Sequence, residues 1–74
     1  MITETLINHI RENRARLDMT QEQLANLVGV TRQTIISIEA GKYVPSALLA
    51  FKIARVFERT MEMVFELKEE PYND

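Results

Sequence analysis

Four polar side chains lie close together in the stretch VTRQTIISIEAGKYVPS, which covers residues 30–46. They are Arg32, Gln33, Thr34 and Ser37. All four side-chain types form hydrogen bonds readily, and a row of them suits a flat surface with a fixed pattern of donors and acceptors. Ile35 and Ile38 have the spacing of one buried helical stripe, and Gln33 and Ser37 fall on roughly the opposite side. The pattern therefore predicts a helix that packs by its isoleucines and presents polar groups outward.

Two short helices joined by a tight turn would position these side chains. The first helix is expected to begin at Thr20, because this threonine and a glutamine three residues later form a capping-box sequence. Gly29 ends that helix, since a residue without Cβ adopts the left-handed conformation at low cost. The second helix is expected to begin after Thr31 and to end at Gly41. Residues 20–41 thus predict a helix-turn-helix.

Helical spacing also occurs before this motif and within its first helix. Leu6, Ile10 and Leu17 fall on one face of an expected helix over about residues 4–17. In the helix that begins at Thr20, the expected inner face consists of Leu24, Leu27 and Val28.

The region after the motif predicts one further helix and an ambiguous segment. Ser46 can cap a helix over about residues 47–57. In TMEMVFELKEE, apolar residues alternate with mostly polar ones, which is typical of a strand, but three of them also fit one helical turn. The alternating residues are Met61, Met63, Phe65 and Leu67. We expect a short helical turn at about residues 60–64, followed by a strand at about residues 64–69.

The composition indicates a single small domain over residues 1–74, with an acidic tail at residues 60–74. The net charge is −2, but residues 1–59 carry +2 and residues 60–74 carry −4. There is no cysteine, His9 is the only histidine, and we recognise no catalytic constellation. No apolar run is long enough to span a bilayer. We therefore expect a cytoplasmic protein that is not an enzyme, binds no metal or cofactor and does not associate with membranes.

The stretch TQEQLANLVGVTRQTIISIEAGKYVPS resembles the DNA-binding domain of the phage Cro/repressor (XRE-type) helix-turn-helix family. The resemblance covers about residues 5–65. It implies an all-α, compact, lambda-repressor-like DNA-binding domain of four or five helices. A short C-terminal β-strand used in dimerisation is the expected addition to that fold.

The resemblance also implies which residues contact double-stranded DNA. In this family the second helix of the motif lies in the major groove, and the positions that face the base edges correspond to Arg32, Gln33, Thr34 and Ser37. Arginine suits guanine and glutamine suits adenine, in agreement with that assignment. The positions that hold the sugar-phosphate backbone correspond to Thr20, Gln21, Lys42 and Tyr43.

A charged residue beside the apolar face of the first expected helix is also explained by the resemblance. The family commonly pairs the residue that corresponds to Arg14 with the acid that corresponds to Glu39. We expect a partly buried ion pair with a structural role, because it would set the angle of the reading helix.

Three departures from the family pattern are informative. Glu58 replaces a glycine that often ends the helix before it, and Ile36 replaces a polar residue on the outward half of the reading helix. Ile36 would either meet thymine methyl groups or be a tolerated exposed apolar residue. Leu48 and Met63 are apolar where acids are common and, with Phe51, leave an apolar surface.

That surface suggests a homodimer on a near-palindromic DNA site, with the C-terminal strand paired to its twin. The residues expected at the dimer interface are Met61, Met63, Phe65 and Leu67.

The favoured hypothesis is a sequence-specific transcriptional regulator that acts as a repressor. A second hypothesis is the antitoxin of a toxin–antitoxin pair, which binds its operator and a toxin through different faces. A third is a protein-interaction module that has lost DNA binding, as the near-neutral charge would allow.

Overall fold

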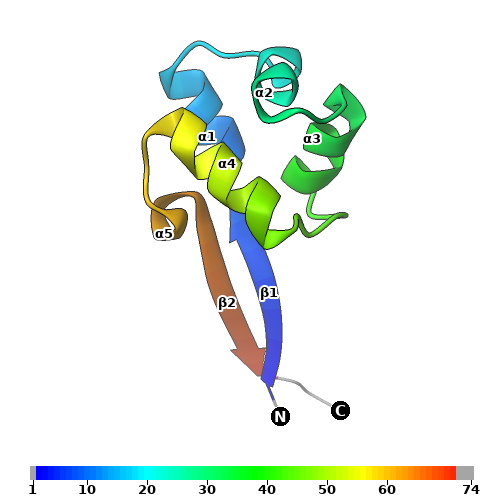
Figure 1. The fold of residues 1–74 in the computed structure, drawn as a ribbon. Helices are drawn as coiled ribbons and strands as arrows, with labels where there is room; N and C mark the ends of the chain where they lie inside the picture. The colour runs from blue at the N-terminus through cyan, green and yellow to red at the C-terminus, as the bar shows by residue number, and fades with distance from the viewer. Residues whose placement is uncertain (1, 72–74) are drawn as a thin grey trace.

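A computed structural model describes the backbone of residues 2–71 and the side chains of residues 4–70. Five helices and two strands occur in this part of the chain. In chain order they are β1 (Ile2–Asn8), α1 (Ile10–Arg16), α2 (Gln21–Val28), α3 (Arg32–Glu39), α4 (Ala47–Phe57), α5 (Met61–Val64) and β2 (Phe65–Pro71). The helices form one body, and β1 and β2 project from it as a two-stranded antiparallel ribbon (Figure 1). The molecule is therefore elongated, with principal extents of 42 × 23 × 21 Å.

The helix-turn-helix begins as the sequence predicts. The Thr20 hydroxyl accepts a hydrogen bond from the Gln23 backbone N–H at 3.0 Å, and the Gln23 side chain accepts one from the Thr20 N–H at 2.8 Å. This capping box satisfies two backbone donors at the start of α2. Gly29 follows α2 with φ of 79°, and the side chain of Thr31 caps α3.

The two ends of the α3–α4 connection are also defined by local bonds. After α3, Gly41 has φ of 75°, and the Lys42 N–H donates to the Ser37 carbonyl at 2.9 Å. Ser46 caps α4 by accepting from the Leu49 N–H at 3.2 Å. The α3–α4 loop therefore leaves α3 in a fixed direction.

The core of the helical body contains residues from every helix. Its fully buried large side chains are Ile10, Leu24, Ile35, Ile38, Ile53, Phe57 and Val64. Two leucines that we expected to point inward do not, because Leu17 and Leu27 are 41% and 63% exposed. In α2, Leu24, Ala25 and Val28 fill the space against α3 and α4 and leave Leu27 on the outer side.

The expected helix over residues 4–17 is wrong in its first half. Residues 2–8 form β1, and only Ile10–Arg16 are helical. β1 pairs with β2 in a register that joins Leu6 to Leu67 and Asn8 to Phe65. This segment contains two threonines and two isoleucines, β-branched residues that suit a strand once a partner strand is present.

The C-terminal prediction of a helical turn followed by a strand is confirmed by α5 and β2. An all-α fold is therefore wrong in part, because the chain contains a small antiparallel sheet. The partner of the C-terminal strand in the structure is β1 of the same chain, not a twin strand. The end of the acidic tail, residues 72–74, lies outside the described residues. Among the described helices, none has the length and apolar character needed to cross a membrane.

Candidate nucleic-acid interface

Helix α3 has one buried face and one open face. Ile35 and Ile38 are buried against the rest of the helical body. On the other side Arg32 and Gln33 are exposed, and Ser37 is partly exposed. Because the isoleucines fix the rotation of α3 about its axis, the polar side chains hold a constant orientation relative to the body.

Two surface hollows flank α3, and between them they contain every residue that we expected to touch DNA. One hollow is lined by Thr31, Gln33, Thr34, Ser37, Lys42 and Tyr43. The other is lined by Arg14, Thr20, Gln21, Glu22 and Arg32. The structure thus brings the four base-contact candidates together with the four backbone-contact candidates on the α2–α3 side of the molecule.

Two threonines in these hollows already take part in hydrogen bonds. The hydroxyl groups of Thr31 and Thr34 are 3.0 Å apart, and the Thr20 hydroxyl accepts from the capping box. A hydroxyl group that accepts one bond keeps its own proton as a donor. Thr20 can therefore still donate to an anion at the start of α2, whereas the hydroxyl groups of Thr31 and Thr34 share one bond with each other.

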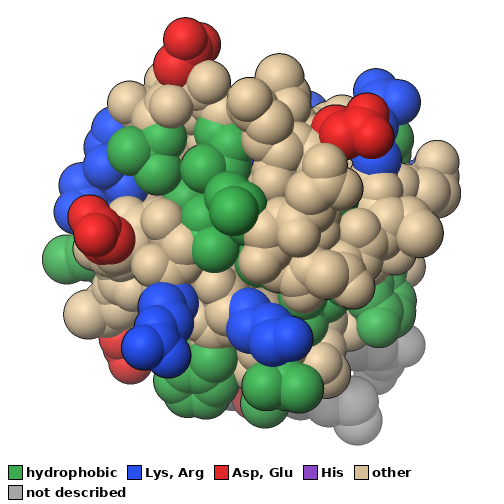
Figure 2. All heavy atoms as spheres, turned by 45° about the horizontal axis from the view of Figure 1, so that its top comes forward, with side chains coloured by type: hydrophobic (Ala, Val, Ile, Leu, Met, Phe, Trp, Pro, Cys, Tyr) green, Lys and Arg blue, Asp and Glu red, His purple; other side chains and the backbone are tan. Residues whose placement is uncertain are grey.

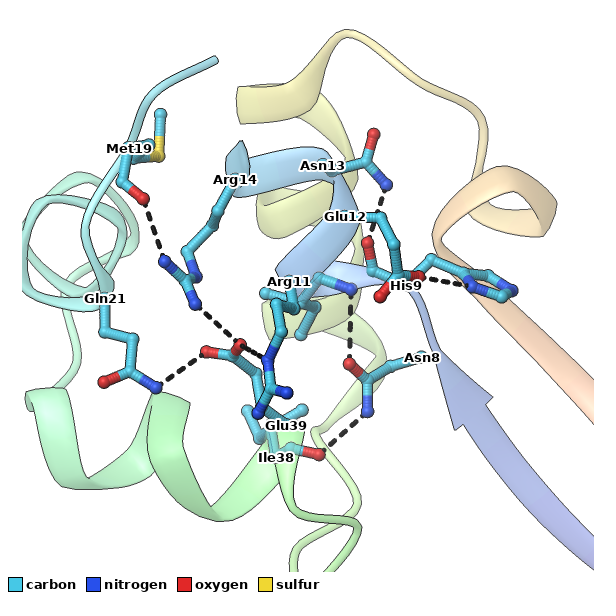
Figure 3. A network of polar contacts seen from close by, with 11 residues as sticks. Asn8, His9, Arg11, Glu12, Asn13, Arg14, Met19, Gln21, Ile38 and Glu39 are labelled. Carbon is cyan, nitrogen blue, oxygen red and sulfur yellow. Dashed lines mark hydrogen bonds and ion pairs between the residues drawn. The ribbon is translucent and has the colours of Figure 1, made fainter. Parts of the chain in front are cut away.

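The structure also brings Arg14 and Glu39 together (Figure 3). The Arg14 guanidinium donates to the Glu39 carboxylate at 2.9 Å and to the Met19 carbonyl at 2.9 Å. The Glu39 side chain is 3% exposed and that of Arg14 is 15% exposed. Arg11, at 3.8 Å, adds a second and weaker cation. This ion pair connects α1 and the α1–α2 loop to the last turn of α3.

Gln21 has a structural contact in addition to the DNA contact that we expected of it. Its side-chain amide donates to the second carboxylate oxygen of Glu39 at 3.1 Å, and the side chain is partly buried. The same carboxylate therefore holds α1 through Arg14 and α2 through Gln21 (Figure 3). Gln21 lines the hollow beside Arg32, but its amide also helps to hold α2 against α3.

Asn8 is a positioning residue that the sequence reasoning missed. Its side-chain amide donates to the Ile38 carbonyl at 2.9 Å, and its side-chain oxygen accepts from the Ile10 N–H at 3.2 Å. Asn8 thus joins the end of β1, the start of α1 and the end of α3 (Figure 3). Asn8 stands one residue before His9, the N-cap of α1, so the usual N-cap signal does not mark it in the sequence.

Comparison with known proteins identifies the family of this arrangement. The family model described as helix-turn-helix matches residues 10–64, which include α1 to α5. The chain belongs to the XRE-type helix-turn-helix family.

Relatives of this XRE-type chain occur in bacteria and archaea. YgzD of Bacillus subtilis, an uncharacterised HTH-type transcriptional regulator, is 56% identical over 63 residues, which are 85% of this chain and 96% of that protein. An uncharacterised HTH-type transcriptional regulator of Archaeoglobus fulgidus is 56% identical over 61 residues, which are 82% of this chain and 86% of that protein. This chain shares its fold with the crystal structure of a candidate DNA-binding protein from Bacteroides fragilis, with a TM-score of 0.76 and 22% sequence identity. The superposition covers 84% of this chain and all of the other one.

The surface of this XRE-type domain is mostly uncharged on the face drawn in Figure 2. There, Lys and Arg side chains form small separate groups, and much of the area between them is uncharged polar surface or backbone. Near α3, the charged residues that line the hollows are Lys42 in one and Arg14, Glu22 and Arg32 in the other. Charge on this side is therefore sparse.

Proposed function

We propose that this chain is a sequence-specific DNA-binding transcriptional regulator, acting as a repressor, that reads the major groove with α3. One observation carries the proposal: all eight candidate contact residues line the two hollows that flank α3, while Ile35 and Ile38 anchor the helix from behind. The major groove is about 12 Å wide and admits an α-helix.

The proposed contacts divide into two groups by chemistry. Arg32 and Gln33 are exposed, and each can form paired hydrogen bonds with a base edge, worth roughly 1–3 kcal/mol of discrimination per good pair. Ser37 and the methyl group of Thr34 would contact neighbouring positions. The residues proposed to hold the sugar-phosphate backbone are Thr20, Gln21, Lys42 and Tyr43, and such contacts fix register without reading sequence.

A homodimer would give two copies of α3 to one DNA site. Four large apolar side chains are more than half exposed on α4, α5 and β2, namely Leu48, Phe51, Met63 and Leu67. Of the residues expected at the interface, Phe65 is buried in its own core and Met61 lies in a hollow between α4 and α5 beside Phe51. We propose that this apolar surface pairs two copies about a two-fold axis, with the copies of α3 roughly 34–36 Å apart.

Selection of bound duplexes from random DNA tests the proposed function directly. We expect enrichment of a near-palindrome whose half-sites are one helical turn apart, and a mobility shift that weakens steeply as the salt concentration rises. Gln33→Ala should relax the choice at one base pair of each half-site. Asn26→Ala is the matched control, because Asn26 is an exposed amide on α2 outside both hollows that flank α3. Failure to enrich any sequence, with the protein folded, would overturn the proposal.

The antitoxin hypothesis draws on the same exposed apolar surface. The mass of the pure chain in solution separates the two uses of that surface. A dimer at tens of micromolar supports self-association, and a Phe51→Lys variant should then dissociate. A monomer at that concentration would contradict the dimer and would leave Leu48, Phe51 and Met63 for a different protein partner.

A further inference from the structure

Ile36 is an apolar side chain in an unusual place on α3. It is partly buried, yet it is not among the partly buried apolar residues that pack against the core within the described chain. Those residues are Leu6, Met19, Val30, Val56 and Met61. Packing of the core therefore does not account for an isoleucine at this position.

The helical geometry of α3 places Ile36 within its outward face. With about 100° of rotation per residue, Ile36 and Ser37 lie on opposite sides of Gln33, at about 60° and about 40° from it. Each also lies about 130° away from the middle of the buried stripe formed by Ile35 and Ile38. Ile36 and Ser37 are thus equivalent in orientation, one on each flank of Gln33.

We propose that Ile36 is a specificity-determining residue that recognises the C5-methyl group of a thymine in the major groove. This inference rests on the proposed function, in which α3 enters that groove. Thymine is the only one of the four DNA bases that carries a methyl group on its major-groove edge, and apolar side chains form the usual contacts with it. The Ile36 side chain offers no hydrogen bond, so a methyl group is the feature of the groove that it can match.

The same side chain would also reject other bases at this position. Cytosine and adenine present an amino group to the major groove. An amino group pressed against the Ile36 side chain would lose its bond to water without gaining a partner, which costs free energy. Ile36 would therefore select thymine both by contact with the methyl group and by exclusion of an unpaired donor.

Replacement of thymine by deoxyuridine tests this contact, because it removes the methyl group and leaves base pairing unchanged. The probe is the duplex obtained by selection from random DNA, with each thymine replaced in turn. For the wild-type protein, we expect one thymine of each half-site to show a loss of affinity of roughly fourfold per methyl group, the value of one buried methylene. The Ile36→Ala protein should bind the thymine and deoxyuridine duplexes equally at that position.

Two control variants separate a specific contact from a general effect. Ile36→Val keeps a branched apolar side chain and should retain most of the difference between thymine and deoxyuridine. Leu27→Ala removes an exposed apolar side chain from the outer side of α2 and should leave the difference unchanged. Thermal unfolding of each variant establishes that it is folded, and Ile36→Ala should be folded because alanine favours the helix.

The outcomes distinguish this inference from the proposed function. If selection enriches a sequence but no deoxyuridine substitution affects wild-type binding, DNA recognition stands and the role of Ile36 is refuted. The same conclusion follows if a sensitive thymine is equally sensitive in the Ile36→Ala protein. If selection enriches no sequence at all, the proposed function itself fails, and the inference fails with it.

Discussion

Replacement of Glu39 with alanine should destabilise the fold by about 3 kcal/mol, because it leaves the Arg14 guanidinium without its counterion in a nearly closed site. Removal of one partner from a fully buried ion pair costs about 3–5 kcal/mol. The lower value applies here, since Arg14 retains 15% exposure and its bond to the Met19 carbonyl. The Gln21 amide also loses its acceptor, so the loss should not fall far below this value.

The expected loss is large for a chain of this length. At about 0.05–0.15 kcal/mol per residue, a domain of 74 residues has a total stability of roughly 4–11 kcal/mol. A loss of about 3 kcal/mol should lower Tm by roughly 12–24 °C. Urea unfolding followed by circular dichroism measures the change in free energy directly, provided that the m-value of the variant matches that of the wild type.

Two further variants make the reasoning refutable. Glu22→Ala removes an exposed carboxylate from α2 and should change stability by about 0.5 kcal/mol or less. A double variant, Arg14→Met with Glu39→Met, removes both charges. It should be clearly more stable than the summed losses of the Arg14→Met and Glu39→Met single variants predict. A cost below about 1 kcal/mol for Glu39→Ala, or strict additivity in the double variant, would contradict the claim that the pair is held in a desolvated site.

Three other changes have defined outcomes. Glu58→Gly should raise the free energy of unfolding by roughly 0.5–1 kcal/mol in urea titration, because Glu58 ends α4 at φ of 55° and glycine removes that strain at some entropic cost. The hydrogen bond with Glu12, supported by Glu66, raises the pKa of His9 above its ordinary value of 6.5 against the opposing effect of burial. The resulting stabilisation is complete below about pH 6.5 and is lost as the pH rises through the pKa of His9 in the folded protein. The urea midpoint should therefore decline as the pH rises through this range, and the decline should be smaller in the His9→Gln variant. Lys42→Ala should weaken binding to selected and unrelated duplexes by the same factor and reduce the slope of affinity against salt by about 1.

The helix-turn-helix was predictable because its signals are local. The capping box at Thr20, the left-handed glycines at 29 and 41 and the cap at Ser46 all act within a few residues of the chain. Such signals hold whatever the rest of the fold does. The periodicity of Ile35 and Ile38 then determined which side of α3 would be open.

The N-terminal strand was not predictable in the same way. Leu6 and Ile10 are four residues apart, so their spacing alone favours a helix. The decisive interaction is the pairing of residues 2–8 with residues 65–71, at the opposite end of the chain. Strand formation depends on such a partner more than on intrinsic propensity, and local periodicity carries no information about it.

The candidate site shows the same division between local and distant causes. The position of Gln33 on the open face follows from helical periodicity within α3. The contact between Arg14 and Glu39 was expected from family resemblance, since no local rule joins residues 25 positions apart. The bond from Gln21 to Glu39 depends on how α2 crosses α3, and only the three-dimensional arrangement reveals it.

The ribbon has a consequence for how the molecule assembles. Its innermost pair joins Asn8 to Phe65, and beside it the His9 N–H donates to the Val64 carbonyl at 2.7 Å. In an unfolded chain, pairing Asn8 with Phe65 closes a long loop, and the entropy lost exceeds the stabilisation that one residue pair provides. Once the helices have packed together, they hold the inner ends of β1 and β2 side by side, so that this entropy is already lost. The strands can then pair progressively from Asn8 and Phe65 to Ile2 and Pro71 (Figure 1). Protection of the β1 amides from hydrogen exchange should therefore decrease from Asn8 toward Ile2. Unfolding of the helical body should unfold the whole ribbon with it.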